Sequence, residues 1–296
     1  MLTALFVAVR IVANPAANVF QKQLVLRSAN PLFIIGATHA FLTAATLPLL
    51  FGSVTSALGR EFWTTMTISA LLAVAGNVLL VYALKASDLS VLGPLNAYKA
   101  VISLVLGVIL IGEIPSVAGL AGVLLILAGS YFVVDRDPTQ PRRNAFAQFF
   151  RERGVQLRFA ALVLSATEAV FLKRALLLSS ALTTFVFWSL LGLPIAATAI
   201  VLLLRRQAAN ELVLLRRNWL TYASLAMTTG LMQAATVFTF GKLQVGYSLA
   251  LFQLSTVISV FLGYRYFREI NFRQRIVGSL IMIAGAGLIV VLGRNP

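Results

Sequence analysis

The sequence predicts an all-α integral membrane protein with ten transmembrane helices, arranged as two inverted repeats of five helices. Three observations support this fold class: the composition, the spacing of the apolar segments, and a similarity between the two halves of the chain. Of the 296 residues, 59% are hydrophobic and 11% are charged, and the mean hydropathy is +0.92. A soluble protein of this length needs more charged side chains to cover its surface, so the composition favours a protein embedded in a bilayer.

Ten apolar segments are long enough to cross the hydrocarbon core of a bilayer as helices. In chain order they are residues 2–21, 31–51, 63–84, 89–111, 116–134, 157–178, 182–204, 219–241, 246–267 and 274–292. The only long polar segment, residues 135–156, separates a first five-helix unit, residues 1–134, from a second, residues 157–296. We interpret this segment as a solvated linker. A short interfacial amphipathic piece around Phe146, Phe149 and Phe150 is the alternative.

The two units are similar to each other. Residues 82–134 align with residues 238–290 without a gap, and the shared polar positions are not explained by an apolar composition. Because each unit holds an odd number of spans, the two copies must have opposite orientations in the membrane, as in many secondary transporters. Matched pairs include Ser103 and Ser259, Gly107 and Gly263, Glu113 and Glu269, Gly122 and Gly278, Gly129 and Gly285, and, in a second aligned block, Lys22 and Lys173.

Small residues in the last helix of each unit predict surfaces where helices approach closely. In the first unit these are Gly119, Gly122 and Gly129, and in the second they are Gly278, Gly285 and Gly287.

The formal charge of +15 comes from 24 Lys and Arg against nine acidic residues. Most of the bases lie in the loops after the odd-numbered helices, where anionic lipid and membrane topology explain them better than nucleic acid does. The opposite side holds only five: Arg60, Lys173, Arg174, Lys242 and Arg294. By the positive-inside rule, both termini would then lie outside the cytoplasm.

Ionisable residues inside a span are costly, so each one is a candidate functional residue. Arg10, His39, Lys99 and Glu168 lie near the middle of predicted helices, and Arg10 shares a helical stripe with Asn14 and Asn18. Such side chains should face a cavity, because hydrocarbon cannot satisfy them. The candidate solute-binding residues are Arg10, Asn14, His39, Asn96, Tyr98, Lys99, Glu168 and Gln253.

Each of these residues also has a structural interpretation. Lys99 and Glu168 can form a buried ion pair that fixes helix packing, and His39 can be a hydrogen-bonded packing residue. Glu168 is the leading candidate for a proton carrier, whereas Arg10 can bind an anion but cannot release its proton. The Gly93-Pro94 pair, like Pro15 in the first helix, predicts either an interrupted helix at the binding site or a simple kink.

Several other classes of function are not supported. The chain has no cysteine, no Walker motif, no dinucleotide-binding glycine signature and no cluster of histidine with carboxylates. We therefore expect no cofactor, no metal, no ATP-driven pump and no enzyme.

Two segments carry a resemblance to a known family: GPLNAYKAVISLVLGVILIGEIPSVAGLAGVLLILAG and LALFQLSTVISVFLGYRYFREINFRQRIVGSLIMIAGAG. They resemble the drug/metabolite transporter superfamily, and most of all its EamA-type members with ten helices. Three departures stand out. His39 takes a helix 2 position that often holds arginine, Arg268 replaces the glycine that Gly112 keeps in the first unit, and the charge bias opposes the cytoplasmic termini usual in the family. A partial resemblance to the small multidrug resistance branch rests on Glu168.

Together, the residues and the resemblance predict a multi-pass transporter of the inner membrane that works by alternating access. The expected partner is a small zwitterionic or anionic metabolite, such as an amino acid, which the protein exports. The alternatives are a proton-coupled antiporter of organic cations or drugs, with Glu168 binding proton and substrate in turn, and a lipid-headgroup flippase. Membrane lipid and a coupling proton are further expected partners, and nucleic acid is not. The sequence does not indicate the oligomeric state.

Overall fold

The computed structural model describes nearly all of the predicted helical segments. It covers residues 2–52, 58–99, 101–102, 105, 116–133, 149–205, 207–243, 245–269 and 271–292. Every regular element in these ranges is a helix, and none of them is a strand. Six of the helices are long and apolar enough to cross a membrane, so the chain is a multi-pass membrane protein. They are Leu2–Leu26, Pro31–Phe51, Arg60–Ala86, Arg153–Leu177, Ala181–Leu203 and Phe272–Ile289.

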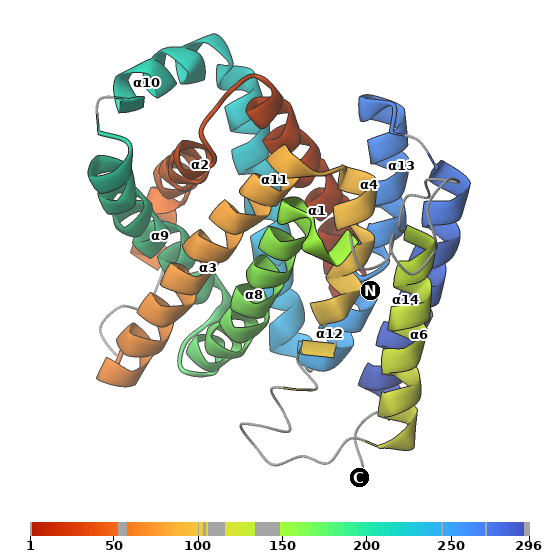
Figure 1. The fold of residues 1–296 in the computed structure, drawn as a ribbon. Helices are drawn as coiled ribbons and strands as arrows, with labels where there is room; N and C mark the ends of the chain where they lie inside the picture. Colours follow the sequence, from red (N-terminus) through yellow and green to blue (C-terminus); the bar gives the residue numbers. More distant parts are fainter. Residues whose placement is uncertain are drawn as a thin grey trace.

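The helices follow the predicted order (Figure 1). The first half contains α1 (Leu2–Leu26), α2 (Pro31–Thr46) with the 3-10 turn η1 (Leu47–Gly52), α3 (Arg60–Ala86), α4 (Leu89–Leu92) with η2 (Pro94–Ala97), and α6 (Val117–Val133). The second half contains α8 (Arg153–Leu177), α9 (Ala181–Leu203), α10 (Gln207–Arg217), α11 (Trp219–Lys242), α12 (Val245–Phe252), α13 (Ser255–Phe267) and α14 (Phe272–Leu292).

Local sequence explains where several helices begin. Asn30 caps α2, because its side chain accepts a hydrogen bond from the backbone N–H of Leu32, and Pro31 fits the first helical position. Ser180 caps α9 in the same way, with its hydroxyl accepting from the N–H of Thr183. Each cap satisfies an N–H group that the helix itself cannot pair.

The predicted fourth and ninth helices differ from continuous spans. The fourth is interrupted at Gly93 and continues as a 3-10 turn from Pro94, because proline has no N–H for the helical ladder. The ninth is divided between Phe252 and Ser255. In α1, by contrast, the helix runs through Pro15 without a break.

Two other boundaries departed from the sequence prediction. Helix α8 begins at Arg153, so the linker ends earlier than expected, and Phe149 is buried in the core just before it. Residues 134–148, which include Phe146, lie outside the described residues. The connection between the predicted spans 182–204 and 219–241 contains the helix α10, which lies across one end of the bundle (Figure 1), and there Glu211 accepts from the N–H of Asn30.

Helices from the two halves alternate in the bundle. Helix α1 packs along α11, and its counterpart in the second half, α8, packs along α3. Helices α2 and α9 contact each other, as do α6 and α14, which lie side by side at one edge of the molecule (Figure 1). Each contact therefore has an equivalent when the two halves are exchanged.

The contact between α6 and α14 depends on glycines that face each other. A side chain at Gly122 would meet the backbone oxygen of Gly285 at 2.7 Å, and one at Gly285 would meet the oxygen of Gly122 at 2.6 Å. Gly129 likewise faces the oxygen of Gly278, at 2.8 Å. Because Gly122 aligns with Gly278, and Gly129 with Gly285, the contact is reciprocal, which is the geometry of a two-fold axis. The predicted close approach holds at these four positions, but Gly287 faces open space.

The end of α13 explains why a glycine was expected where Arg268 stands. Arg268 has a left-handed backbone, with φ at 54°, and its N–H donates to the carbonyl of Gly263 to close the helix. Glycine is the usual residue at such a helix end because it adopts this conformation without steric cost. Arg268 thus occupies a backbone position that suits glycine.

Replacing Gly122 with alanine should destabilise the protein, because the new methyl group would collide with backbone atoms of α14. We expect a loss of about 1–3 kcal/mol in unfolding free energy, seen as a lower midpoint of thermal unfolding in detergent. Gly287→Ala is the matched control and should leave the midpoint unchanged or raise it. Equal effects of the two substitutions would show that the glycine contact is not close-packed.

Replacing Arg268 with glycine should stabilise the end of α13 by about 1 kcal/mol, because the strain of the left-handed backbone is relieved. Arg265→Gly removes the same charge from the helical last turn and should destabilise by about 1 kcal/mol. Thermal unfolding of the two variants measures the difference. A shift of the same sign in both would rule out the backbone explanation.

Candidate functional site

A cavity of about 120 Å³ lies between the two halves of the chain. A water molecule needs roughly 10–15 Å³ of such space, so the cavity holds about ten waters or a small metabolite. Its walls come from α1, α3, α8, α9, α11 and α12, and from the segment just after α4. Both halves therefore contribute to one site.

Two helices present long polar stripes to this cavity. On α1 the stripe consists of Arg10, Asn14, Asn18 and Gln21, which extends roughly 16 Å along the helix axis at 1.5 Å per residue. On α8 the lining residues include Arg158, Ser165 and Glu168. The 3.6-residue period explains both stripes, because these positions fall on one helix face.

Arg10 is held at the wall by residues of the second half. Its Nε donates to the Oγ1 of Thr236 at 2.8 Å, and its guanidinium carbon lies 4.9 Å from the centre of the Phe252 ring. The Nη1 atom is buried and has no hydrogen-bond partner among the described residues. A bound acceptor group in the cavity would satisfy it.

Arg158 is held by a chain of amide groups. Its Nη2 donates to the Oδ1 of Asn96 at 3.1 Å, and the Nδ2 of Asn96 donates to the Oε1 of Gln253 at 3.3 Å. This chain links α8 to the turn after α4 and to the break between α12 and α13. The interrupted helices thus place polar side chains where continuous helices would not. The buried Nε of Arg158 has no partner within the described part of the chain.

Glu168 and Lys99 both line the cavity. The Oε1 of Glu168 accepts from the hydroxyl of Ser69 at 3.4 Å. No ion pair joins Glu168 and Lys99 in the described structure, so the alternative of a tight packing pair is not what is observed. Both side chains line the same cavity without an ion pair between them in the described residues.

Three predicted site residues lie outside the cavity lining. His39 is buried, with its Nδ1 3.3 Å from the carbonyl of Ser189 and its ring 4.9 Å from that of Trp188. This arrangement matches the alternative of a packing histidine. Tyr98 packs edge-on against Phe159, with ring centres 4.9 Å apart. Gln253 is absent from the lining and accepts a hydrogen bond from Asn96, which does line the cavity.

The sequence groups Arg158 with the bases of the loop before the sixth span, because it is only the second residue of the predicted segment 157–178. Since α8 begins at Arg153, Arg158 lies in its second turn and is buried. Gln21 was also missed, although it continues the α1 stripe at helical spacing. Asn77 and Gln233 lie on helices without another mid-span charge, so no signal in the sequence indicated them.

The electrostatics of the cavity favour a negatively charged group. Three basic side chains, Arg10, Lys99 and Arg158, line it against one carboxylate, Glu168. The side-chain nitrogen of Gln233 adds one more buried donor without a partner among the residues described. Donors that lack acceptors are costly when buried, so the site fits a ligand rich in acceptor oxygens.

The comparisons with known proteins agree with this architecture. Residues 2–135 match the model of the EamA-like transporter family. The match covers slightly less than half of the chain and is consistent with the drug/metabolite transporter superfamily. EamA-like proteins are membrane transporters, and the several membrane-spanning helices of this chain are consistent with that role.

Solved structures with a similar fold are known. One of them, described only as a crystal structure of a protein, has a TM-score of 0.59 and 15% sequence identity, and the match covers 96% of this chain and 97% of that one. At this identity the likeness concerns the fold alone. A search of the curated proteins finds none that matches the sequence.

Proposed function

We propose that the protein is a secondary transporter of the inner membrane, built of two inverted five-helix repeats, that exports a small anionic or zwitterionic metabolite such as an amino acid. The observation that carries this proposal is the cavity, which combines three basic side chains, one carboxylate and several unpaired donors. Alternating access around a site shared by both halves fits the exchange symmetry of the helix contacts.

The polar groups suggest how such a solute would bind. A carboxylate accepts well from guanidinium groups, whose donors are fixed in a planar fork. Arg10 and Arg158 each keep one unpaired nitrogen for this purpose. Glu168 would accept from the ammonium group of an amino acid, while Lys99 adds positive charge and so favours solutes with excess negative charge.

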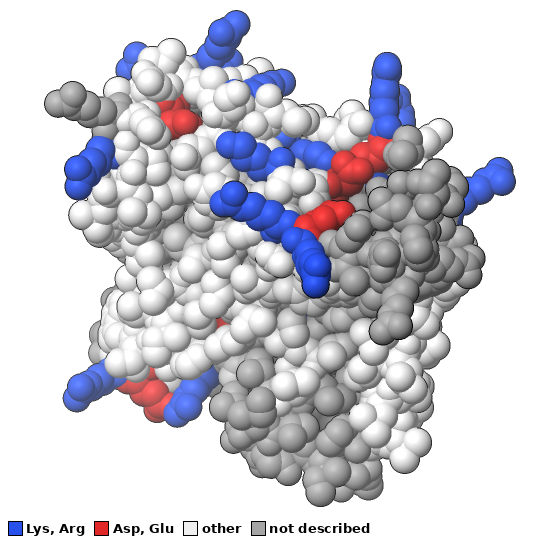
Figure 2. Space-filling model, in the orientation of Figure 1, with Lys and Arg blue, Asp and Glu red and all other residues white. Residues whose placement is uncertain are grey.

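The distribution of charge supports an orientation. In Figure 2, most of the Lys and Arg side chains on the visible face lie toward the end that carries α4 and α10. A smaller group lies at the opposite end. We call the α10 end the basic side. By the positive-inside rule the basic side faces the cytoplasm, and export then moves the solute away from it.

A second candidate function is antiport of organic cations with protons. It is favoured by Glu168, a carboxylate that lines the cavity and accepts a long hydrogen bond, 3.4 Å, from Ser69. In this case the carboxylate would bind the proton and the cation in turn.

Proteoliposomes with purified protein should take up amino acids or small organic acids. Arg158→Gln should raise the KM for the solute about tenfold, because one charge-assisted hydrogen bond of about 1.4 kcal/mol is lost. Arg27→Gln removes the same charge from an exposed site on the basic side, where Arg27 bonds Asn218 and Thr221, and should leave the KM unchanged. Uptake of cations alone would contradict the proposal.

Glu168→Gln separates the two candidates. If the solute is an anion, the variant should still transport it, with weaker discrimination in favour of amino acids over plain carboxylates. If the protein is a proton-coupled cation antiporter, the variant should lose the response of flux to a pH gradient. Measuring solute flux with and without that gradient checks both outcomes.

A further inference from the structure

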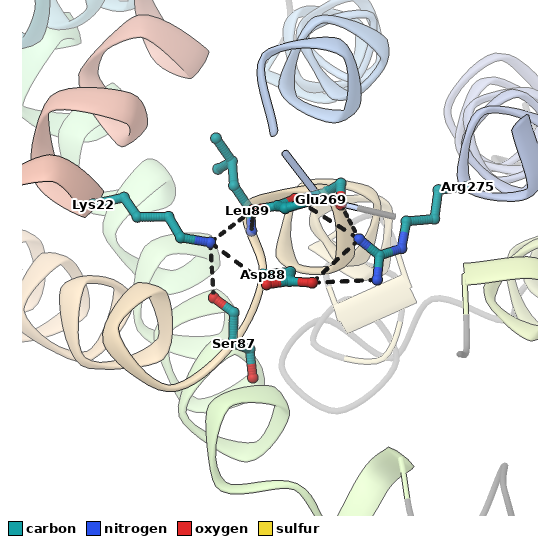
Figure 3. A network of polar contacts seen from close by, with 7 residues as sticks. Lys22, Ser87, Asp88, Leu89, Glu269 and Arg275 are labelled. Carbon is teal, nitrogen blue, oxygen red and sulfur yellow. Dashed lines mark hydrogen bonds and ion pairs between the residues drawn. The ribbon is translucent and has the colours of Figure 1, made fainter. Parts of the chain in front are cut away.

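Four charged side chains form a cluster at one end of the cavity (Figure 3). Lys22 of α1 donates to the Oε1 of Glu269 at 2.7 Å and lies 3.7 Å from the Oδ1 of Asp88. From the other side, Arg275 of α14 lies 3.4 Å from the Oδ2 of Asp88 and 3.7 Å from the Oε2 of Glu269. Two basic and two acidic groups thus alternate around a closed ring.

The cluster joins the two halves of the chain. Lys22 and Asp88 belong to the first half, and Glu269 and Arg275 belong to the second. The cluster holds together the end of α1, the start of α4, the turn after α13, and the first turn of α14. A movement of one half relative to the other at this end must therefore break these ion pairs.

Its position is directly beside the cavity. Gln21 lines the cavity, and Lys22 is the next residue of α1 toward the basic side. Around this end the fully buried side chains of Leu84, Leu89 and Val155 form part of an apolar cluster. An apolar layer and the four charges therefore lie next to the Gln21 end of the cavity.

Glu269 is fixed more tightly than the other members. Its two carboxylate oxygens accept from the backbone N–H groups of Leu89 and Ser90, at 2.9 and 2.8 Å. Burial acts to raise the pKa of Glu269, but the positive charge and hydrogen bond of Lys22, with hydrogen bonds from Ser90, hold that pKa below its usual value. Glu269 is therefore ionised at neutral pH.

Room for this carboxylate comes from Gly263, because a side chain there would lie 2.3 Å from the Oε2 of Glu269. The Lys22 ammonium also lies 4.9 Å from the centre of the Phe267 ring. The carboxylate of Glu269 and the ammonium of Lys22 are therefore closely packed against α13.

The exposure of the cluster is uneven. The side chains of Arg275 and Glu269 are 0% and 3% exposed, whereas that of Asp88 is 43% exposed. Water therefore reaches one edge of the ring. Charged groups that separate at such an edge are hydrated as they part, which lowers the cost of breaking buried ion pairs.

We propose that Lys22, Asp88, Glu269 and Arg275 form an ionic gate that keeps the cavity closed on the basic side and that breaks when the cavity opens there. This inference rests on the proposed transport function. In the present structure the gate is closed, so solute from the basic side has no path to Arg158 and Asn96 until the ion pairs separate.

The absence of cysteine from the sequence makes a direct test possible, since single cysteines can be added without a background. Ser165→Cys reports access to the cavity, because Ser165 lines it. Asn210→Cys and Thr64→Cys are exposed markers for the basic side and the opposite side, and they define which side of a vesicle a membrane-impermeant thiol reagent reaches.

We expect Ser165→Cys to react slowly when the reagent is added on the basic side. Lys22→Met or Glu269→Gln should raise that rate at least tenfold. Asp88→Asn should raise it less, because Asp88 is partly hydrated and makes the longer contacts. Arg174→Gln is the control: it breaks the exposed ion pair with Glu61, 2.5 Å long, near the opposite marker, and should leave the rate from the basic side unchanged.

The labelling needs no solute, so it can fail independently of the transport assay. If Asp88→Asn and Glu269→Gln stay folded, as shown by an unchanged thermal unfolding midpoint, yet the rate from the basic side does not rise, the cluster is a static clamp and the gate is refuted. If Lys22→Met does not fold, Asp88→Asn still decides the question. A rise with Arg174→Gln equal to that with Glu269→Gln would also overturn the proposal.

Discussion

Hydrocarbon cannot hydrogen-bond, and this constraint determines where the charged side chains within the described membrane-spanning helices lie. Four charged side chains lie within membrane-spanning segments, where lipid or apolar packing cannot satisfy them. They therefore point into a shared polar space, and they are Arg10, Lys99, Arg158 and Glu168. They meet in one cavity between the two halves. The helices around it are placed by contacts that need no polar groups, such as the crossing of Gly122 with Gly285.

The interrupted helices connect the scaffold to the site. Breaks at Gly93 and near Gln253 turn backbone and side chains toward the cavity, and there Asn96 links Arg158 to Gln253. The same region begins with Leu89 and Ser90, whose N–H groups hold Glu269. One short segment after α3 therefore contributes to both the proposed solute site and the proposed ionic gate. A substitution that moves this segment is therefore expected to alter both the Asn96 contacts and the Glu269 contacts.

The sequence predicted much of the fold because hydropathy and helical period report directly on burial in a bilayer. The α1 stripe and the glycines of α6 and α14 follow from period alone. Arg158 was missed because its place depends on a helix start four residues earlier than the apolar window suggests. His39 was included because a mid-span charge is a good indicator of a cavity, but its ring fits between Trp188 and Gly192 instead. Which partner a buried polar group finds depends on tertiary contacts, and a single sequence does not contain them.

The central claim is that the cavity binds an anionic group, and a binding measurement at Trp188 tests it most directly. Trp188 lines the cavity, and the chain has three tryptophans, so Trp63→Phe with Trp219→Phe leaves it as the sole reporter. The account predicts a saturable change in fluorescence with amino acids or organic acids, weakened at least tenfold by Arg10→Gln. A saturable change with organic cations that Arg10→Gln leaves intact, and none with acids, would contradict it.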